Sequence, residues 1–335
     1  MALWAGTTIN SNETAQAFNR LFQRKSIELP RRKQGILFAV LGETEEHSTP
    51  EAGNGWKRMY NHTSGNKIEV KLLGKTPSPS TVSDANQINT ATLTFTTDYW
   101  GAAEFSLAHY AYTHPIPHSE LDRFAGNEAK TEDYLQDVFD LVMLGYQVQW
   151  GTAMNTSAAP SRTVLGGYPY AINDSNSYGT IDRSDSGNAD YRGLVNSSFG
   201  DITIPKLDYE IGRVIINGGD ASYANCGLSV WSKIKTILQN YSTVTYDKDW
   251  AKFGGKWVQY AGTRFTLDNY AIAATLALMT PETWALFKDE AVPFTKTGVV
   301  NDTSRIATYV LQTGFWMQLL CLQPNQNNYL SGIVV

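Results

Sequence analysis

The sequence predicts an α+β fold, and three features of its apolar pattern support this. Within residues 66–97, two segments alternate apolar and polar side chains, which is the period of a β-strand. Residues 128–150 carry a broad apolar stripe at helical spacing. Residues 203–300 then alternate helical and strand-like segments. Together these features indicate helices and strands in mixed order along one chain.

The composition narrows the class of protein. The chain has 335 residues, a mass of 37.1 kDa and a net charge of −5. Only 18% of its residues are charged, below the roughly 25% of an average soluble chain, and 12% are aromatic. The composition excludes a disordered chain and a disulfide scaffold, and the absence of any run near 18 apolar residues excludes a transmembrane protein. The net acidity argues against a dedicated nucleic-acid binder. Few charges and many Tyr and Trp residues indicate a surface that meets other protein, although a polar, uncharged β-rich surface fits equally well.

The N-terminus shows no targeting signal, because it lacks a basic segment followed by a long apolar one. The Asn-x-Ser/Thr triplets are attributed to an Asn-, Ser- and Thr-rich composition rather than to glycosylation. We expect Cys226 and Cys321 to be free thiols, since distant cysteines in a chain without a secretory signal are typical of a reducing compartment.

Residues 1–35 are predicted to form an arm with a short helix. Ser11 or Asn12 can cap this helix, Phe18 and Phe22 lie on its apolar face, and Pro30 ends it. Six basic residues, Arg31 and Arg32 among them, against two acidic ones give the arm a charge of +4 and leave −9 for the rest. A basic arm indicates contact with an acidic partner surface or nucleic acid, and the alternative is a solvated helix face.

Residues 66–97 are predicted to form a long hairpin. Ile68 and Val70 alternate with polar residues in its first strand, and Leu93 and Phe95 do so in its second. The link between the strands is long, polar and contains two prolines. Because a two-stranded ribbon is marginally stable alone in water, it needs a surface to lie on, and a neighbouring subunit is a natural candidate.

Residues 128–150 form the clearest predicted helix, with acidic residues in its first turn. Its apolar stripe includes Leu135, Val138, Phe139 and Val142. Beyond it we expect short strands and turns in residues 151–200, helices at 207–215 and 229–241, and a strand–turn–strand unit at 258–265. Thr280 and Pro281 indicate a further helix start, and residues 303–324 a long strand buried on both faces.

The sequence contains no complete motif for catalysis or metal binding. The Gly-Lys-Thr sequence at 74–76 lacks the upstream glycine of a phosphate-binding loop, and no Gly-x-Ser-x-Gly or His-Glu-x-x-His motif occurs. His114 and His118 flank two prolines and are interpreted as turn residues. Asp182, Arg183, Asp208 and Glu210 are interpreted as solvated or structural charges, although a glycosidase with distant carboxylates stays open. We therefore assign no catalytic residue, no cofactor and no metal.

The order of these elements resembles that of the major capsid protein of tailed bacteriophages, whose fold encapsulin shells share. Four short sequences carry the resemblance: VLGGYPYAI at 164–172, YGTIDRS at 178–184 with YRG at 191–193, YAGTRFTLD at 260–268 followed by LMTPETW at 278–284, and LQPN at 322–325 with Gly332. Their joint order covers nearly the whole chain.

The resemblance implies a tailed-phage capsid fold, with an N-terminal arm, an extended β-hairpin loop, a peripheral domain with a long spine helix, and an axial domain. These would be residues 1–35, 36–110, 111–214 with the spine at 128–150, and 215–300, and residues 301–335 would return to the peripheral domain. Two features depart from the family. The strand at 222–227 is weak, and no partner is found for a covalent cross-link from Lys67, Lys71 or Lys75.

The resemblance further implies a non-enzymatic shell protein that self-assembles into hexamers and pentamers of an icosahedral head around double-stranded DNA. Its other expected partners are a separate scaffolding protein, a portal and, as further candidates, decoration proteins, with assembly in the host cytoplasm and no membrane. Inter-subunit contacts are expected at Phe18, Phe22, Arg31, Arg32, Ile68, Val70, Leu93 and Phe95. The alternatives are an encapsulin-like compartment shell and a carbohydrate- or receptor-binding β-rich protein.

Overall fold

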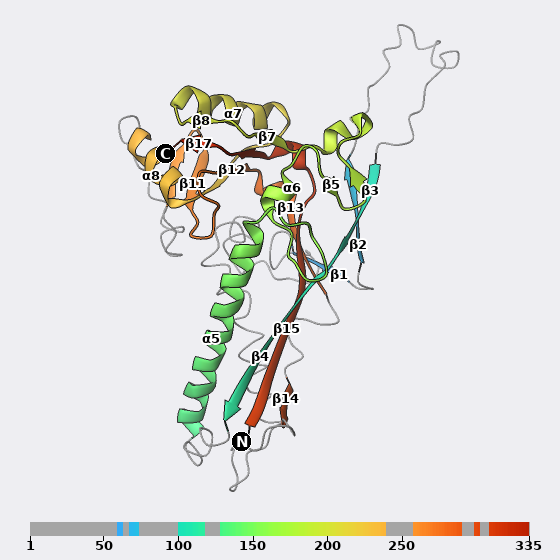
Figure 1. Ribbon diagram of the computed structural model, residues 1–335, viewed down its shortest axis with the longest axis vertical. Helices are drawn as coiled ribbons and strands as arrows, with labels where there is room; N and C mark the ends of the chain where they lie inside the picture. The colour runs from blue at the N-terminus through green and yellow to red at the C-terminus, as the bar shows by residue number, and fades with distance from the viewer. Residues whose placement is uncertain are drawn as a thin grey trace, which may run out of the picture.

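The computed structural model describes residues 59–62, 67–73, 100–117, 128–238, 257–289, 298–301 and 308–334. The described chain forms a broad body from which a long helix and two paired strands extend (Figure 1). The predicted arm, with Phe18, Phe22, Arg31 and Arg32, lies outside the described residues, as do Leu93 and Phe95.

The extension is built on one 14-residue strand, β15 (Thr308–Cys321). Along one edge it pairs antiparallel with β4 (Ala108–Pro117). Along the other edge it pairs with β14 (Gly298–Asn301) and then β13 (Trp284–Asp289), and β13 in turn pairs with β1 (Met59–His62). The long strand predicted at 303–324 is therefore present, and it organises this five-stranded sheet.

Helix α5 (Glu128–Met154) extends one turn beyond its predicted end at Trp150. Its buried apolar side chains follow one another at intervals of four residues: Val138, Val142, Tyr146, Trp150 and Met154. That spacing places them on one helix face, where they share a core with residues of β4 and β15. The side chains of Leu135 and Phe139 lie outside the described ones.

A six-stranded sheet forms the centre of the body. Its order is β10 (Trp257–Tyr260), β11 (Thr263–Leu267), β9 (Tyr223–Cys226), β12 (Leu276–Met279), β16 (Asn328–Leu330) and β7 (Leu194–Asn196). Helices α7 (Ile204–Ile216) and α8 (Leu228–Leu238) share a core with one face, to which β9 contributes Ala224 and Cys226. Tyr223 instead belongs to the core that contains α5. The sheet is thus buried on both faces.

Shorter elements connect these layers. They are β2 (Lys67–Leu73), β3 (Trp100–Ser106), α6 (Tyr168–Ala171), β5 (Ser177–Tyr178), β6 (Ile181–Asp182), β8 (Gly200–Asp201), β17 (Ile333–Val334) and the 3₁₀ turns Ser186–Tyr191, Pro281–Thr283 and Pro324–Gln326. The expected short strands and turns in residues 151–200 are confirmed, and Cys226 and Cys321 are free and buried. No helix within the described ranges is long and apolar enough to cross a membrane.

The family strand that the weak segment at 222–227 left in doubt is present as β9, a fully buried strand inside the six-stranded sheet. Two sequence-based expectations were wrong. The helix expected from Thr280 is a single 3₁₀ turn, after which β13 begins at the buried Trp284. His114 lies in a strand rather than a turn, because Pro115 and Pro117 are tolerated on the edge strand β4.

The predicted hairpin differs in its second strand. The partner of β2 is β3, with Leu73 opposite Trp100, rather than a strand at 92–97. The first strand was placed correctly. The long link predicted between the strands lies outside the described residues.

A matched pair of glycine variants tests this packing. A Cβ at Gly167, just before α6, would lie 1.8 Å from the Thr156 carbonyl oxygen, whereas one at Gly212, inside α7, would meet nothing within 4 Å. We predict that Gly167→Ala lowers the free energy of unfolding by about 2 kcal/mol or more. Gly212→Ala should raise it by up to about 1 kcal/mol, because alanine favours helices. Denaturant unfolding measures both, and equal stabilities would contradict the packing at Gly167.

Candidate inter-subunit surfaces

The candidate functional surfaces are a two-stranded ribbon and the outward faces of three helices. The ribbon consists of β2 and β3. Ile68 and Val70 are buried within the subunit, in the same core as Phe105, while Lys67 and Glu104 form an ion pair on the exposed side. The burial of Ile68 and Val70, expected to contact a neighbour, thus has an explanation within the chain. The ribbon's charged side stays exposed, whereas the outer edge of β3 is partly covered by Thr180, which hydrogen-bonds to the Glu104 amide and the Ala102 carbonyl.

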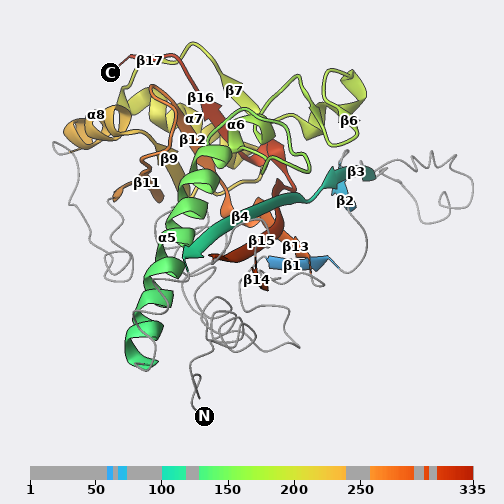
Figure 2. The same cartoon turned by 60° about the horizontal axis from the view of Figure 1, so that its bottom comes forward.

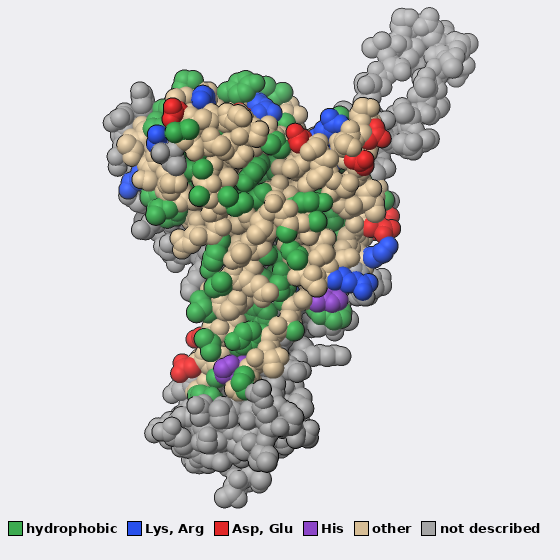
Figure 3. Space-filling view, in the orientation of Figure 1, with side chains coloured by type: hydrophobic (Ala, Val, Ile, Leu, Met, Phe, Trp, Pro, Cys, Tyr) green, Lys and Arg blue, Asp and Glu red, His purple; other side chains and the backbone are tan. Residues whose placement is uncertain are grey.

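The outward face of α5 carries an apolar stripe. Leu141, Leu144 and Val148 are each about half exposed and lie at i, i+3 and i+7, so they share one face of the helix. That face lies opposite the buried Val142 and Tyr146. Figure 3 shows hydrophobic side chains along this part of the molecule, with few charges among them. The stripe was not foreseen, since the sequence pattern of α5 gives one broad apolar face.

Helix α7 exposes larger apolar groups. Tyr209 is 68% exposed and Ile216 is 86% exposed, on the side opposite the buried Leu207, Ile211 and Val214. Solvent-facing apolar side chains of this size on a regular helix favour a partner surface when they gather together. Gly212 lies between Tyr209 and Ile216 and leaves the centre of this face open.

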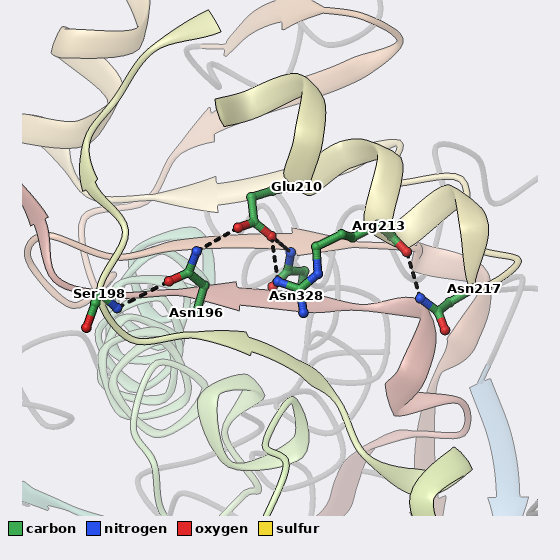
Figure 4. Close-up of polar contacts among 6 residues, drawn as sticks. All are labelled: Asn196, Ser198, Glu210, Arg213, Asn217 and Asn328. Carbon is green, nitrogen blue, oxygen red and sulfur yellow. Dashed lines mark hydrogen bonds and ion pairs between the residues drawn. The ribbon is translucent and has the colours of Figure 1, made fainter. Parts of the chain in front are cut away.

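A buried carboxylate fixes α7 to the sheet (Figure 4). Glu210 Oε1 accepts a hydrogen bond of 2.7 Å from Asn196 Nδ2, and Oε2 accepts bonds of 2.8 Å from Arg213 Nη1 and 2.7 Å from Asn328 Nδ2. Asn196 belongs to β7 and Asn328 to β16. Glu210 is thus a structural charge, as expected, and the face that carries Tyr209 and Ile216 is held rigidly.

A second buried network joins α5 to the six-stranded sheet. Asp268 Oδ2 accepts hydrogen bonds of 3.1 Å from both Asn155 Nδ2 and Asn225 Nδ2, and Asp268 Oδ1 accepts one of 2.9 Å from the Tyr270 amide. The Tyr168 hydroxyl donates to Asn155 Oδ1 at 2.6 Å. Burial, and then the Asp268 charge, raise the pKa of Tyr168 well above its usual value, so this phenol stays a donor.

Asp182 and Arg183 have separate structural roles. Asp182 is exposed and accepts hydrogen bonds from the amide and hydroxyl of Ser184, which lower its pKa. Arg183 is fully buried: its Nη1 donates to the Asn173 carbonyl at 2.8 Å, and its guanidinium lies 4.3 Å from the centre of the Tyr178 ring. Burial lowers the pKa of Arg183. Within the described ranges, no three His, Cys, Asp or Glu side chains are grouped to hold a metal.

No family model and no curated protein sequence matches the chain, but solved structures do. A chain of the cyanophage A-1(L) capsid matches with a TM-score of 0.60 and 10% identity, covering 90% of this chain and 93% of that one. The chain has the shell-protein fold of phage capsids and encapsulins. A chain of the satellite phage P4 procapsid matches with a TM-score of 0.52 and 10% identity, covering 93% of this chain and 91% of that one. The SrpI encapsulin of Synechococcus elongatus matches with a TM-score of 0.51 and 9% identity, covering 86% of this chain and 89% of that one.

This shell fold confirms the fold class that the sequence resemblance implied. Such low identity explains why only the order of short segments was visible in the sequence. The sequence analysis missed the exposed apolar groups on α7 and α8. Each is an apolar residue on the otherwise polar side of a helical pattern, and this position was the signal that could have identified them: Tyr209, Ile216 and Leu228.

The Asp268 network yields a prediction. Asp268→Asn replaces one acceptor oxygen by an amide that faces other donors, so we expect it to cost about 1–3 kcal/mol of unfolding free energy. Asp190→Asn, the same change at an exposed site, is the control and should cost little. Thermal and denaturant unfolding compare the two. Equal stability of both variants would show that the network does not hold α5 to the sheet.

Proposed function

We propose that the chain is a major capsid protein, which self-assembles through hexamers and pentamers into the icosahedral head of a tailed phage and encloses double-stranded DNA. The observation that carries this proposal is the match to capsid chains over about nine-tenths of both chains. The exposed apolar faces on α5 and α7 support it, because a shell subunit must offer surface to its neighbours. The role is structural rather than catalytic, and the location is the virion.

In this proposal each part of the chain has a place in the shell. Residues 36–110 supply the extended loop, residues 111–214 and 301–335 the peripheral domain with α5 as its spine, and residues 215–300 the axial domain. The ten-residue pairing of β15 with β4 supports the return of the C-terminal part to the peripheral domain. The six-stranded sheet, to which β7 and β16 also contribute, supports a firm junction between the two domains.

Assembly follows from many modest contacts. Head-to-tail contacts between identical subunits close into rings when their rotation permits. Each contact made raises the effective concentration for the next, so a shell can be firm although single contacts are weak. The basic arm of residues 1–35 would meet DNA or an acidic neighbour without reading sequence.

The proposed partners beyond the subunit itself are a scaffolding protein, a portal and decoration proteins, with assembly in the host cytoplasm. The P4 procapsid structure that the chain resembles includes a size-determination protein, which supports an accessory assembly partner.

An encapsulin-like compartment is the second candidate, favoured by the match to the SrpI encapsulin. The contents of the shells separate the two functions. Nuclease-protected DNA inside particles made during infection supports the capsid, and particles filled with a protein cargo alone support the compartment.

The α5 stripe provides a first test. Leu144→Asp places a charge in the centre of the stripe, and because Leu144 is half-exposed we expect the subunit to stay folded while the assembled fraction falls at least about tenfold. Gln149→Asp adds the same charge at an exposed position of α5 outside the stripe and should assemble normally. Sedimentation measures assembly and circular dichroism measures folding. Normal assembly of Leu144→Asp would exclude α5 as a contact face.

The hairpin provides a second test. Deleting residues 75–89 leaves a link long enough to join Leu73 to Trp100, which lie opposite each other in the ribbon. We predict a folded subunit with impaired assembly, as seen by electron microscopy. An unfolded subunit would contradict the assignment of this segment as a reaching loop.

A further inference from the structure

The outward face of α8 combines apolar and basic groups. Leu228, Ser232 and Lys235 lie at i, i+4 and i+7 and so share the side of the helix turned away from the buried Val230 and Ile234. Trp231 lies at the border of that side and is partly buried against the core. Leu228 is 67% exposed, and the Lys235 ammonium lies 5.3 Å from the centre of the Trp231 ring. Residues 228–238 contain Lys233 and Lys235 but no Asp or Glu.

A second segment has the opposite charge. We call residues 174–190 the acidic loop, because Asp174, Asp182, Asp185 and Asp190 are all exposed there. Its one basic residue, Arg183, is fully buried. The following Arg192 donates to backbone carbonyls of the loop, at 2.6 Å to Arg183 and 3.0 Å to Ser184, rather than to its carboxylates. The four carboxylates therefore form a negative surface on an ordered backbone.

The two surfaces lie at opposite ends of the body. In both ribbon views α8 lies at one end, and β5 or β6, which belong to the acidic loop, at the other (Figures 1 and 2). One chain cannot bring its own two surfaces together without unfolding. Two copies placed head to tail can, and repetition of that contact generates a ring.

We propose that the outward face of α8 binds the acidic loop of a second copy of this chain. The proposal rests on the shell function above and names one of its contacts. Leu228 and the exposed part of the Trp231 ring would form the apolar centre, since Trp is enriched at such centres, and Lys235 would face the carboxylates at the rim. Complementary charges at the two ends would orient neighbours and disfavour pairing of like ends.

Exchange of charges tests this contact. Lys235→Glu places like charges opposite each other, and we expect the concentration needed for assembly to rise about tenfold, with folding unchanged because Lys235 is exposed. Asp190→Lys alone changes the charge of the acidic loop and should raise the concentration needed for assembly by a similar factor. Asp190 is exposed, so this change should leave the fold intact. The double variant Lys235→Glu with Asp190→Lys restores opposite charges and should recover most of the assembly.

The control pairs Lys235→Glu with Asp201→Lys, which makes the same change of charge at an exposed site on β8, outside the acidic loop. This pair should not recover assembly. Light scattering at graded concentrations measures all variants. Normal assembly of Lys235→Glu, or equal rescue by Asp201→Lys, would overturn the contact while the shell function stands. A wild-type chain that never assembles would overturn the shell function itself and this contact with it.

Discussion

The hydrogen bonds that Asp268 accepts from Asn155 and Asn225 are the constraint on which the rest of the structure depends. Asn155 directly follows α5, Asn225 lies in a central strand of the six-stranded sheet, and Asp268 follows β11. One carboxylate thus couples the long extension to the body, in a place where its loss would leave several buried polar groups without partners. In the proposed shell such a joint matters, because the angles between the contact surfaces of a subunit decide whether a ring or shell closes.

The low charge of the chain has a structural explanation. Both faces of the six-stranded sheet are buried within the subunit, and most of the large apolar residues that stay exposed in the described ranges lie in the stripe of α5 and on the outward faces of α7 and α8. The buried groups stabilise the subunit, while the exposed ones are available for association. A subunit whose stability and assembly depend on different residues can fold first and assemble later.

Much of the local structure could be predicted from periodicity, but its pairing could not. Helices α5, α7 and α8 and the β10–β11 unit follow from the spacing of apolar residues. Strand β9 was underrated because burial on both faces removes alternation and its residues are Tyr, Ala, Asn and Cys. The bond between Asn155 and Asp268 spans 113 positions and leaves no local signal. Of the candidate surfaces, the ribbon's first strand was predicted, whereas the outward faces of α5, α7 and α8 needed the fold to define which side is exposed.

The central claim is that this subunit functions by assembling with copies of itself. A cryo-EM reconstruction of the purified chain, with an accessory assembly protein supplied if needed, tests it most directly. The account predicts closed shells in which neighbouring subunits cover the α5 stripe and the outward faces of α7 and α8. Monomers at every concentration, or shells in which these faces all stay exposed to solvent, would contradict it.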